Sequence, residues 1–266
     1  MNAAVNETGP AFYCRLSLAP VHPMISTDLI EQLRDFDTPL LANTIGYISA
    51  APAHEYYLSG EIQSVTPPLG PTVGIAFTAE IDSSTPDGAG DTDLYWELLE
   101  LMRQSPIPSV LVAKAVGSRP EHECMIGDGM AKTLHSVGCV GLVSDSRVRD
   151  VAGLISTPFA AYCRGTIAHH APLRFRSINK PVEIGGVLIQ PGDGLRADIN
   201  GVIRIPPDCI AALPDLAIKN RAFEHEAHMF LRRTDKTPAE KRAHVQALVQ
   251  QYGFNDCVSG RQSVAK

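Results

Sequence analysis

Two aspartates and one arginine in this chain have the types and the spacing of a functional site. Asp128 is followed by twenty residues and then by the pair Arg149-Asp150. Between them the sequence predicts a helix over 130–135, a glycine stop and a buried strand over 139–143. A helix and a strand that run out and back bring both parts of the motif to the same edge of a sheet. Carboxylates supply hard oxygen ligands for a divalent cation, and a guanidinium is a permanent cation whose paired N–H groups can bind a carboxylate. We therefore expect the chemistry at this edge.

Each of these side chains also has a purely structural interpretation. Asp128 stands where a helix begins, and an aspartate at such a position can simply cap the first turn. Arg149 can form an ion pair with Asp150 or with Asp145. The complete motif favours the functional interpretation over both.

The backbone that follows Asp128 is a second candidate binding element. Gly129 and Met130 belong to the first turn of the predicted helix. Their N–H groups have no partner within the helix and lie at the positive end of its dipole, which suits a carboxylate. We predict that both residues bind substrate through the backbone, so that the path of the chain matters more than their side chains.

The composition is typical of one large folded domain with extensions. The chain has 266 residues, 44% of them apolar, and a net charge of −6. This acidic balance, without a dense run of Lys or Arg, excludes the electrostatic signature of a nucleic-acid-binding protein. A local cationic site for a small anionic substrate remains compatible with it.

Cysteine usage and the N-terminus indicate the compartment. The cysteines form no C-x-x-C pair and stand mostly in apolar, strand-like contexts, so we expect reduced, buried thiols. Residues 1–18 have no basic start followed by an apolar stretch, and no apolar run approaches the length of a membrane span. We therefore predict a cytoplasmic protein. The cysteines are Cys14, Cys124, Cys139, Cys163, Cys209 and Cys257.

The rest of the chain supplies the elements that position the motif. We predict an N-terminal arm over 1–25, a core domain over 26–206 and a helical C-terminal extension over 207–266. Strands mixed with helices in this order predict an α+β or layered β/β/α domain rather than a doubly wound nucleotide-binding fold. Helices are expected over 26–34, from Thr38, over 92–103, over about 207–233 with a possible break at Pro214, and from the Thr237-Pro238 capping box to Gly253. Strands are expected over 72–78, 109–113, 139–143 and 159–163, and as a hairpin across Gly185-Gly186.

Other motif types find little support. The histidines show no metalloprotease arrangement, and the neighbours His169 and His170 would point in different directions on regular structure, which disfavours zinc catalysis. The glycine-rich residues 70–74 and 192–194 match neither dinucleotide-binding nor P-loop spacing, so we predict turns there.

The motif and its surroundings resemble a known family. A Val-x-Asp sequence precedes the Arg-Asp pair, Arg-Gly follows it at 164–165, and residues 181–193 contain Pro-Val-x-Ile-Gly-Gly-Val and then Pro-Gly-Asp. Together with the Asp128 spacing, these residues are similar to the RraA-like family over about residues 38–206. That family includes the class II 4-hydroxy-4-methyl-2-oxoglutarate/4-carboxy-4-hydroxy-2-oxoadipate aldolases, which also decarboxylate oxaloacetate.

The resemblance implies a fold, an assembly and a site. The fold would be a swivelling β/β/α domain, assembled as a homotrimer or a hexamer of two trimers with active sites between subunits. A divalent metal, Mg²⁺ or Mn²⁺, would be bound directly by Asp150, while Asp128 would hold one of its waters. Arg149 would bind a 2-oxo acid and stabilise the enolate formed on cleavage. An acidic residue of a neighbouring subunit, here Glu226 or Glu224, would act near the metal waters.

The activity implied is a metal-dependent lyase that cleaves 4-hydroxy-2-oxo acids or decarboxylates oxaloacetate, giving pyruvate. A non-catalytic trimeric regulator of a ribonuclease and a metal-dependent sugar-acid isomerase or dehydratase remain alternatives. Two departures from the family pattern bear on the substrate. Gly129 replaces a bulkier apolar residue, and Arg147 adds a cation that would either bind a second carboxylate or face solvent.

Overall fold

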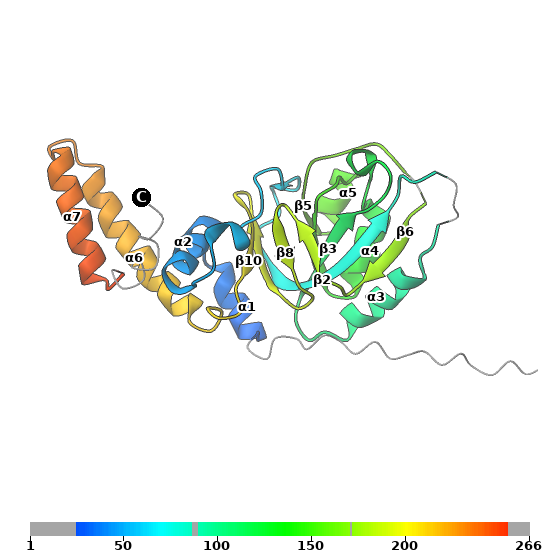
Figure 1. Cartoon of the computed structure of the whole chain (residues 1–266), viewed down its shortest axis with the longest axis horizontal. Coiled ribbons are helices and arrows are strands. Elements are labelled where there is room, and N and C mark those ends of the chain that lie inside the picture. The colour runs from blue at the N-terminus through cyan, green and yellow to red at the C-terminus, as the bar shows by residue number, and fades with distance from the viewer. Residues whose placement is uncertain (1–24, 87–89, 171, 255–266) are drawn as a thin grey trace, which may run out of the picture.

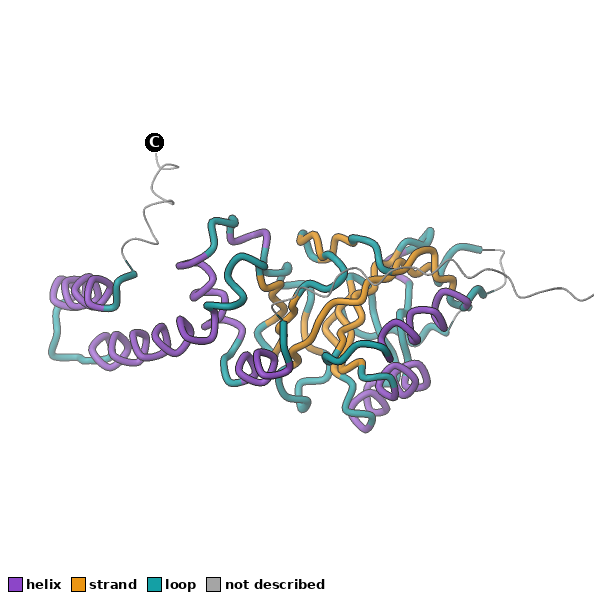
Figure 2. The backbone as a smooth tube through the Cα atoms, turned by 90° about the horizontal axis from the view of Figure 1, so that it is seen from below, coloured by secondary structure: helices purple, strands orange, loops and turns teal. Residues whose placement is uncertain are grey.

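The computed structural model describes residues 25–86, 90–170 and 172–254 of the chain. The predicted N-terminal arm lies outside these residues except for Ile25, and so does the end of the C-terminal extension. The described part consists of a large mixed sheet, a small β-hairpin and helices on one flank, followed by two helices that extend away from the sheet (Figures 1 and 2).

The α-helices are α1 (Thr27–Arg34), α2 (Thr38–Ile48), α3 (Asp93–Arg103), α4 (Asp128–Ser136), α5 (Val151–Ser156), α6 (Leu213–Leu231) and α7 (Pro238–Gln251), with short 3₁₀ turns at Ala53–Glu55 and Pro120–His122. The strands are β1 (Gln63–Ser64), β2 (Thr72–Asp82), β3 (Ser109–Ala115), β4 (Cys139–Ser144), β5 (Ala160–Cys163), β6 (Arg174–Ile178), β7 (Val182–Ile184), β8 (Val187–Ile189), β9 (Gly194–Asp198) and β10 (Gly201–Ile205).

The large sheet has a parallel centre and antiparallel margins. Its order is β1-β5-β4-β3-β2-β9-β10, and β6 also pairs with β2. The pairs β2–β3, β3–β4 and β4–β5 are parallel, and the others are antiparallel. A bridge between Tyr57, which precedes β1, and Ile203 of β10 nearly closes the sheet on itself. Because the parallel strands all point the same way, the loops that follow them meet at one edge of the sheet.

Both faces of the sheet are buried, which gives the fold its layers. Along β3, Leu111 and Ala113 pack into the larger core with the helices, whereas Val110 and Val112 pack into a second core with the β7–β8 hairpin. This alternation follows from the two-residue period of a strand. The hairpin, the sheet and the helices therefore form three layers, which confirms the predicted α+β, layered β/β/α fold.

The C-terminal extension is a helical hairpin with its own small core. Phe223 of α6, Leu248 of α7 and Phe254 pack together, and Tyr47 of α2 stacks on Phe254 with ring centroids 4.4 Å apart. The predicted capping box is present, since Thr237 and Glu240 exchange side-chain-to-backbone hydrogen bonds. The hairpin is thus attached to the core domain through α2.

Two local predictions are wrong. Pro214 does not break a helix; it lies in the first turn of α6, where its missing N–H would have no partner in any case. The predicted turn over 70–74 extends too far, because Gly74 lies inside β2, in agreement with the strand predicted over 72–78, and a Cβ there would be 2.6 Å from the carbonyl oxygen of Pro108. Glycine is thus needed there for close approach of the two backbones. The glycine pair Gly185-Gly186 does form the predicted tight turn, with φ angles of +57° and +80°.

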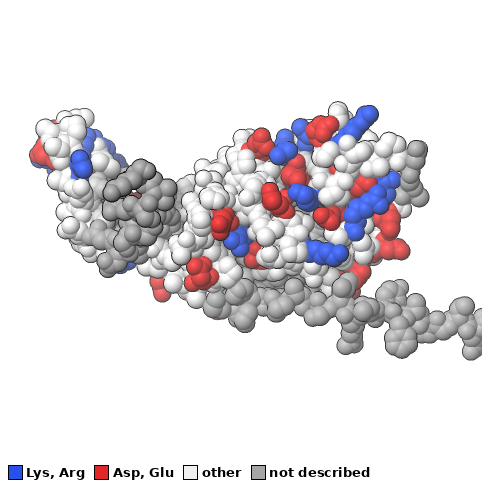
Figure 3. Space-filling view, viewed as in Figure 1, with Lys and Arg blue, Asp and Glu red and all other residues white. Residues whose placement is uncertain are grey.

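The surface and the thiols agree with the composition. Figure 3 shows basic and acidic side chains interspersed over the sheet domain on the face in view.

None of the helices in residues 25–86, 90–170 and 172–254 has both the length and the apolar character needed to cross a membrane. Cys124, Cys139, Cys163 and Cys209 are free and buried, as predicted, whereas Cys14 and Cys257 lie outside the described residues.

Candidate active site

The two parts of the motif meet at the edge where the parallel strands end. Asp128 begins α4 in the connection after β3, and Arg149-Asp150 follow β4. The two connections run side by side: Met125 N–H donates to the carbonyl of Arg147 over 2.8 Å, and Arg149 N–H donates to the carbonyl of Ile126 over 3.1 Å. The out-and-back path predicted from the sequence is therefore correct.

Two glycines allow this close approach. A Cβ on Gly127 would be 2.7 Å from Asp150 Oδ2, and a Cβ on Gly153 would be 2.4 Å from the Cβ of Asp128. Each aspartate thus lies against a glycine that belongs to the other half of the motif. The starts of α4 and α5 interlock, and any larger residue at either glycine would push an aspartate away.

Asp150 has a backbone conformation that is uncommon outside glycine. Its φ of +57° places it in the left-handed region, at the N-cap position of α5, yet its side chain makes no capping hydrogen bond. Instead Asp150 Oδ2 lies 3.3 Å from Arg149 Nε, and the side chain is 43% exposed. Strained backbone positions of this kind cluster at functional sites. The ion pair considered from the sequence is present, but an exposed pair contributes too little stability to explain the strain.

Asp128 is not a helix cap. The N-cap residue of α4 is Gly127, and Asp128 is the first helical residue. Its Oδ2 lies 2.6 Å from Lys132 Nζ one turn later, and this hydrogen bond from Lys132 holds the pKa of Asp128 below its usual value. The side chain is 39% exposed, so the carboxylate stays ionised and open to solvent.

A hollow of about 220 Å³ lies over the start of α4. It contains four of the predicted site residues, whereas Asp150 lies beside it, against Arg149, rather than in its wall. It also contains two histidines that the sequence analysis did not place at the site. We call it the Arg149 hollow. It is lined by Cys124, Met125, Ile126, Gly127, Asp128, Gly129, Met130, Arg149, His169, His170 and Leu173.

The remaining predicted residues lie elsewhere. Arg147 donates to the carbonyl oxygen of Glu121 and does not line the hollow. Glu226 lies on α6, where its Oε2 accepts a hydrogen bond of 3.1 Å from the Tyr252 hydroxyl, and Glu224 accepts one of 3.0 Å from Asn43. Figure 1 shows α6 and α7 at the opposite end of the chain from α4 and α5. Within one chain neither glutamate reaches the motif, so a role for either requires a second copy and stays a prediction.

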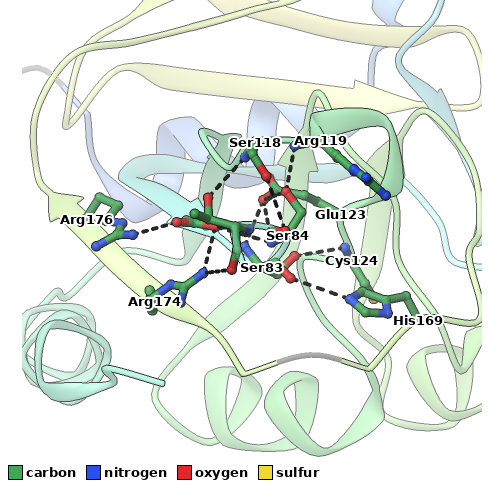
Figure 4. Close-up of polar contacts among 11 residues, drawn as sticks. Ser83, Ser84, Ser118, Arg119, Glu123, Cys124, His169, Arg174 and Arg176 are labelled. Carbon is green, nitrogen blue, oxygen red and sulfur yellow. Dashed lines mark hydrogen bonds and ion pairs between the residues drawn. The ribbon is translucent and has the colours of Figure 1, made fainter. Parts of the chain in front are cut away.

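A buried carboxylate behind the hollow, Glu123, joins the surrounding loops. No pattern in the sequence indicated this role. Glu123 is fully buried, and its Oε1 accepts hydrogen bonds from Ser83 N–H (2.8 Å), Ser84 N–H (3.0 Å) and Ser84 Oγ (2.9 Å). Its carbonyl oxygen accepts from Ser146 Oγ (2.8 Å), and Cys124 N–H donates to Ser83 Oγ (3.3 Å). Figure 4 shows Ser83 and Ser84 between Glu123 and two arginines. The loops after β2, β3 and β4 are thus fixed to one another.

Asp82 ends β2 at the same network. Its Oδ2 lies 2.6 Å from Arg176 and its Oδ1 3.3 Å from Arg174, and Thr85 N–H donates to Oδ1 over 3.0 Å. Burial raises the pKa of Asp82, but the hydrogen bonds from Thr85, Arg176 and Arg174 together outweigh burial, so the net direction is downward. The ionised form is therefore the one that the fold stabilises.

This direction predicts acid sensitivity. A carboxyl whose pKa is lower in the folded state stabilises the fold above its unfolded pKa of about 4, and this contribution is lost as the pH falls towards the folded value. We expect the free energy of unfolding to fall less between about pH 6 and about pH 3 in Asp82→Asn than in the wild type. Urea unfolding at a series of pH values measures this, and parallel pH profiles for the two proteins would contradict it.

The donor set at the motif fits a divalent cation that keeps most of its waters. No three His, Cys, Asp or Glu side chains converge anywhere in the described residues. Asp150 and Asp128 nevertheless present two solvent-accessible carboxylates at interlocked helix starts, and Mg²⁺ uses one or two protein carboxylates together with waters and substrate oxygens. The Asp150 side chain pairs with Arg149 through Oδ2 but does not cap α5 and is 43% exposed, so it is accessible to a ligand.

Comparisons with known proteins identify the family to which the core domain is similar. The RraA-like family, described as Aldolase/RraA, matches residues 39–204. A Halalkalibacterium halodurans protein named "Putative 4-hydroxy-4-methyl-2-oxoglutarate aldolase" is 37% identical over 113 residues, which is 41% of this chain and 51% of that protein. A Shewanella oneidensis protein of the same name is 30% identical over 104 residues, covering 39% of this chain and 62% of that protein. The chain thus spans about half the length of the first of these relatives.

Solved structures share the fold. An uncharacterized protein from Pseudomonas syringae superposes with a TM-score of 0.64 at 22% identity, over 84% of this chain and 96% of that one. Streptomyces coelicolor RraAS2, described as an unusual member of the RNase ES inhibitor RraA protein family, superposes with a TM-score of 0.60 at 24% identity, over 77% and 98%. At these identities the likeness concerns the fold alone, and it agrees with the RraA-like β/β/α architecture predicted from the sequence.

Proposed function

Because the chain belongs to the RraA-like family, we propose that it is a divalent-metal-dependent lyase that acts on small 2-oxo acids and releases pyruvate. The substrate would be a 4-hydroxy-2-oxo acid, cleaved in a retro-aldol reaction, or oxaloacetate, which would be decarboxylated. The observation that carries the proposal is that Arg149, Asp128 and the first turn of α4 line one hollow, with Asp150 directly beside it. The names of the two aldolase-like relatives support the same reaction class.

The chain's own residues have separable roles in this reaction. Arg149 is a permanent cation that would bind the substrate carboxylate and stabilise the charge that develops on the 2-oxo group. The N–H groups of Gly129 and Met130, at the start of α4, would bind a carboxylate as predicted. Asp128, kept ionised by Lys132, would hold a water.

A divalent ion, Mg²⁺ or Mn²⁺, would be held by Asp150 directly and by Asp128 through that water, and would polarise the substrate carbonyl as a Lewis acid. Cleavage of the C–C bond leaves its electron pair on the pyruvate fragment as an enolate beside Arg149. In the retro-aldol case the proton of the distal hydroxyl must leave as well. Glu226 of a neighbouring copy is our proposal for its acceptor, which requires the homotrimer or hexamer that we propose as the assembly.

The test is pyruvate release from oxaloacetate and from 4-hydroxy-4-methyl-2-oxoglutarate, followed through NADH consumption in a coupled assay. We expect turnover with Mg²⁺ or Mn²⁺, loss of turnover in EDTA and recovery when metal is added back. Metal-independent turnover would contradict the mechanism. If the protein binds metal but releases no pyruvate from either substrate, a sugar-acid enolisation would be favoured. If it neither releases pyruvate nor binds metal, a non-catalytic regulator would be favoured.

A further inference from the structure

The proposed lyase reaction needs a proton donor for the enolate, and no residue has yet been assigned to this role. The inference rests on the proposed lyase function. The enolate that remains after cleavage must take up a proton at carbon before pyruvate leaves. The source should be a group that lines the Arg149 hollow and can lose and regain a proton near neutral pH. Five lining residues carry ionisable side chains, namely Cys124, Asp128, Arg149, His169 and His170.

Three of these five are poor proton donors. Arg149 keeps its protons at any pH the protein tolerates. Asp128 is held ionised by its hydrogen bond with Lys132, so it has no proton to give. Burial raises the pKa of the Cys124 thiol to about 11, and the thiol is 6% exposed. Histidine is the side chain whose ordinary pKa lies near neutrality, which leaves His169 and His170.

Of the two histidines, His169 has an orientation set by the surrounding loops. Its Nε2 lies 3.5 Å from the carbonyl oxygen of Ser83, at the long end of hydrogen-bonding distance. A carbonyl can only accept, so Nε2 carries a hydrogen in this contact. The Ser83 backbone is itself fixed by Glu123 Oε1, and Figure 4 shows the chain of contacts from Glu123 through Ser83 to His169. The other ring nitrogen, Nδ1, is then the one available for proton transfer.

We propose that His169 donates the proton that converts the enolate into pyruvate. The Nδ1–H bond of the imidazolium breaks and its proton forms a new C–H bond at C3 of the enolate, whose electron pair moves from the C=C bond into that bond. His169 is left neutral and regains a proton from water, which its exposed position allows. In reverse, neutral His169 removes a methyl proton from bound pyruvate.

The reverse step gives a readout that does not depend on C–C cleavage. In D₂O the wild-type protein with Mn²⁺ should exchange the methyl protons of pyruvate for deuterium, which NMR follows directly. His169→Gln should lower the exchange rate on the order of 100-fold, within the usual range for general acid–base catalysis. The rate at which His169→Gln consumes oxaloacetate should fall by less than about tenfold relative to the wild type, because an enolate formed by decarboxylation can also take a proton from solvent.

Two variants serve as comparators. His54→Gln removes an exposed histidine from the 3₁₀ turn at Ala53–Glu55 and should exchange like the wild type. His170→Gln removes the neighbouring histidine and should lower exchange much less than His169→Gln. If His170→Gln abolished exchange and His169→Gln did not, the assignment to His169 would be wrong.

Chemical rescue separates proton transfer from a merely structural role. In His169→Ala, added imidazole should restore pyruvate exchange in a concentration-dependent way, whereas a packing defect would not respond. If His169→Ala without imidazole exchanged the pyruvate protons as fast as an active wild type, the assignment to His169 would be wrong, but the proposed lyase function would stand. A wild type that neither releases pyruvate from the substrates nor exchanges its protons would overturn both proposals.

Discussion

Asp150→Asn should remove metal-dependent pyruvate release almost completely, by at least a factor on the order of 100–1000, which corresponds to losing a strong electrostatic contact to the reacting group. Asparagine tolerates the left-handed region, so the φ of +57° and the start of α5 are preserved. The substitution replaces a charged ligand oxygen by a neutral one without moving the chain. The measurements are the coupled pyruvate assay and the Mn²⁺ affinity of the same protein.

Matched variants make this prediction specific. Asp128→Asn should cost less activity, because we propose that Asp128 acts through a water rather than directly. Asp150→Ala should lose activity and also about 1–2 kcal/mol of stability, since alanine in the left-handed conformation clashes with the following carbonyl. Asp215→Asn changes an exposed aspartate in the first turn of α6 and should leave activity unchanged. An Asp150→Asn protein that keeps metal-dependent turnover within about threefold of wild type would remove Asp150 from the metal site.

The sequence predicted the parts of the site that depend on local signals. The glycine stop at Gly138 and the apolar strand pattern located α4 and β4 correctly, and the out-and-back path of this helix and strand placed Asp128 next to Arg149-Asp150. The Gly185-Gly186 turn was predicted for the same reason, because glycine adopts positive φ angles readily and glycine pairs are among the residues favoured in tight hairpin turns.

The parts that were missed depend on contacts between distant segments. His169 lies in the connection after β5, whereas most residues of the hollow come from the connection after β3 and Arg149 comes from the connection after β4. Nothing in the local sequence demands the left-handed conformation of Asp150, which lies against Gly127. Helix α5 was missed because six residues are too few to show a helical period. Glu123 stands among polar residues in the sequence, and only the fold shows that it is fully buried.

Glu123→Ala should destabilise the fold by about 2–4 kcal/mol, because a buried donor that loses its acceptor costs about 1–3 kcal/mol and the truncated side chain also loses its packing. The substitution leaves Ser83 N–H without its acceptor, leaves Ser84 N–H with only its longer hydrogen bond of 3.2 Å to Asp82 Oδ1, and opens a cavity between the loops after β2 and β3. Glu123→Gln keeps a side-chain oxygen for both N–H groups and should cost only about 1–2 kcal/mol. Urea unfolding of the two variants against wild type measures the difference.

The neighbouring Glu121 provides the control for this prediction. Its side chain is 63% exposed and pairs only loosely with His122 at 3.8 Å, so Glu121→Ala should change the free energy of unfolding by less than about 0.5 kcal/mol. Because Glu123 fixes Ser83, and Ser83 contacts His169, Glu123→Gln should also retain most of the pyruvate exchange at a temperature where it is folded. A Glu123→Ala protein as stable as Glu121→Ala would show that the loops around the hollow hold one another without this carboxylate.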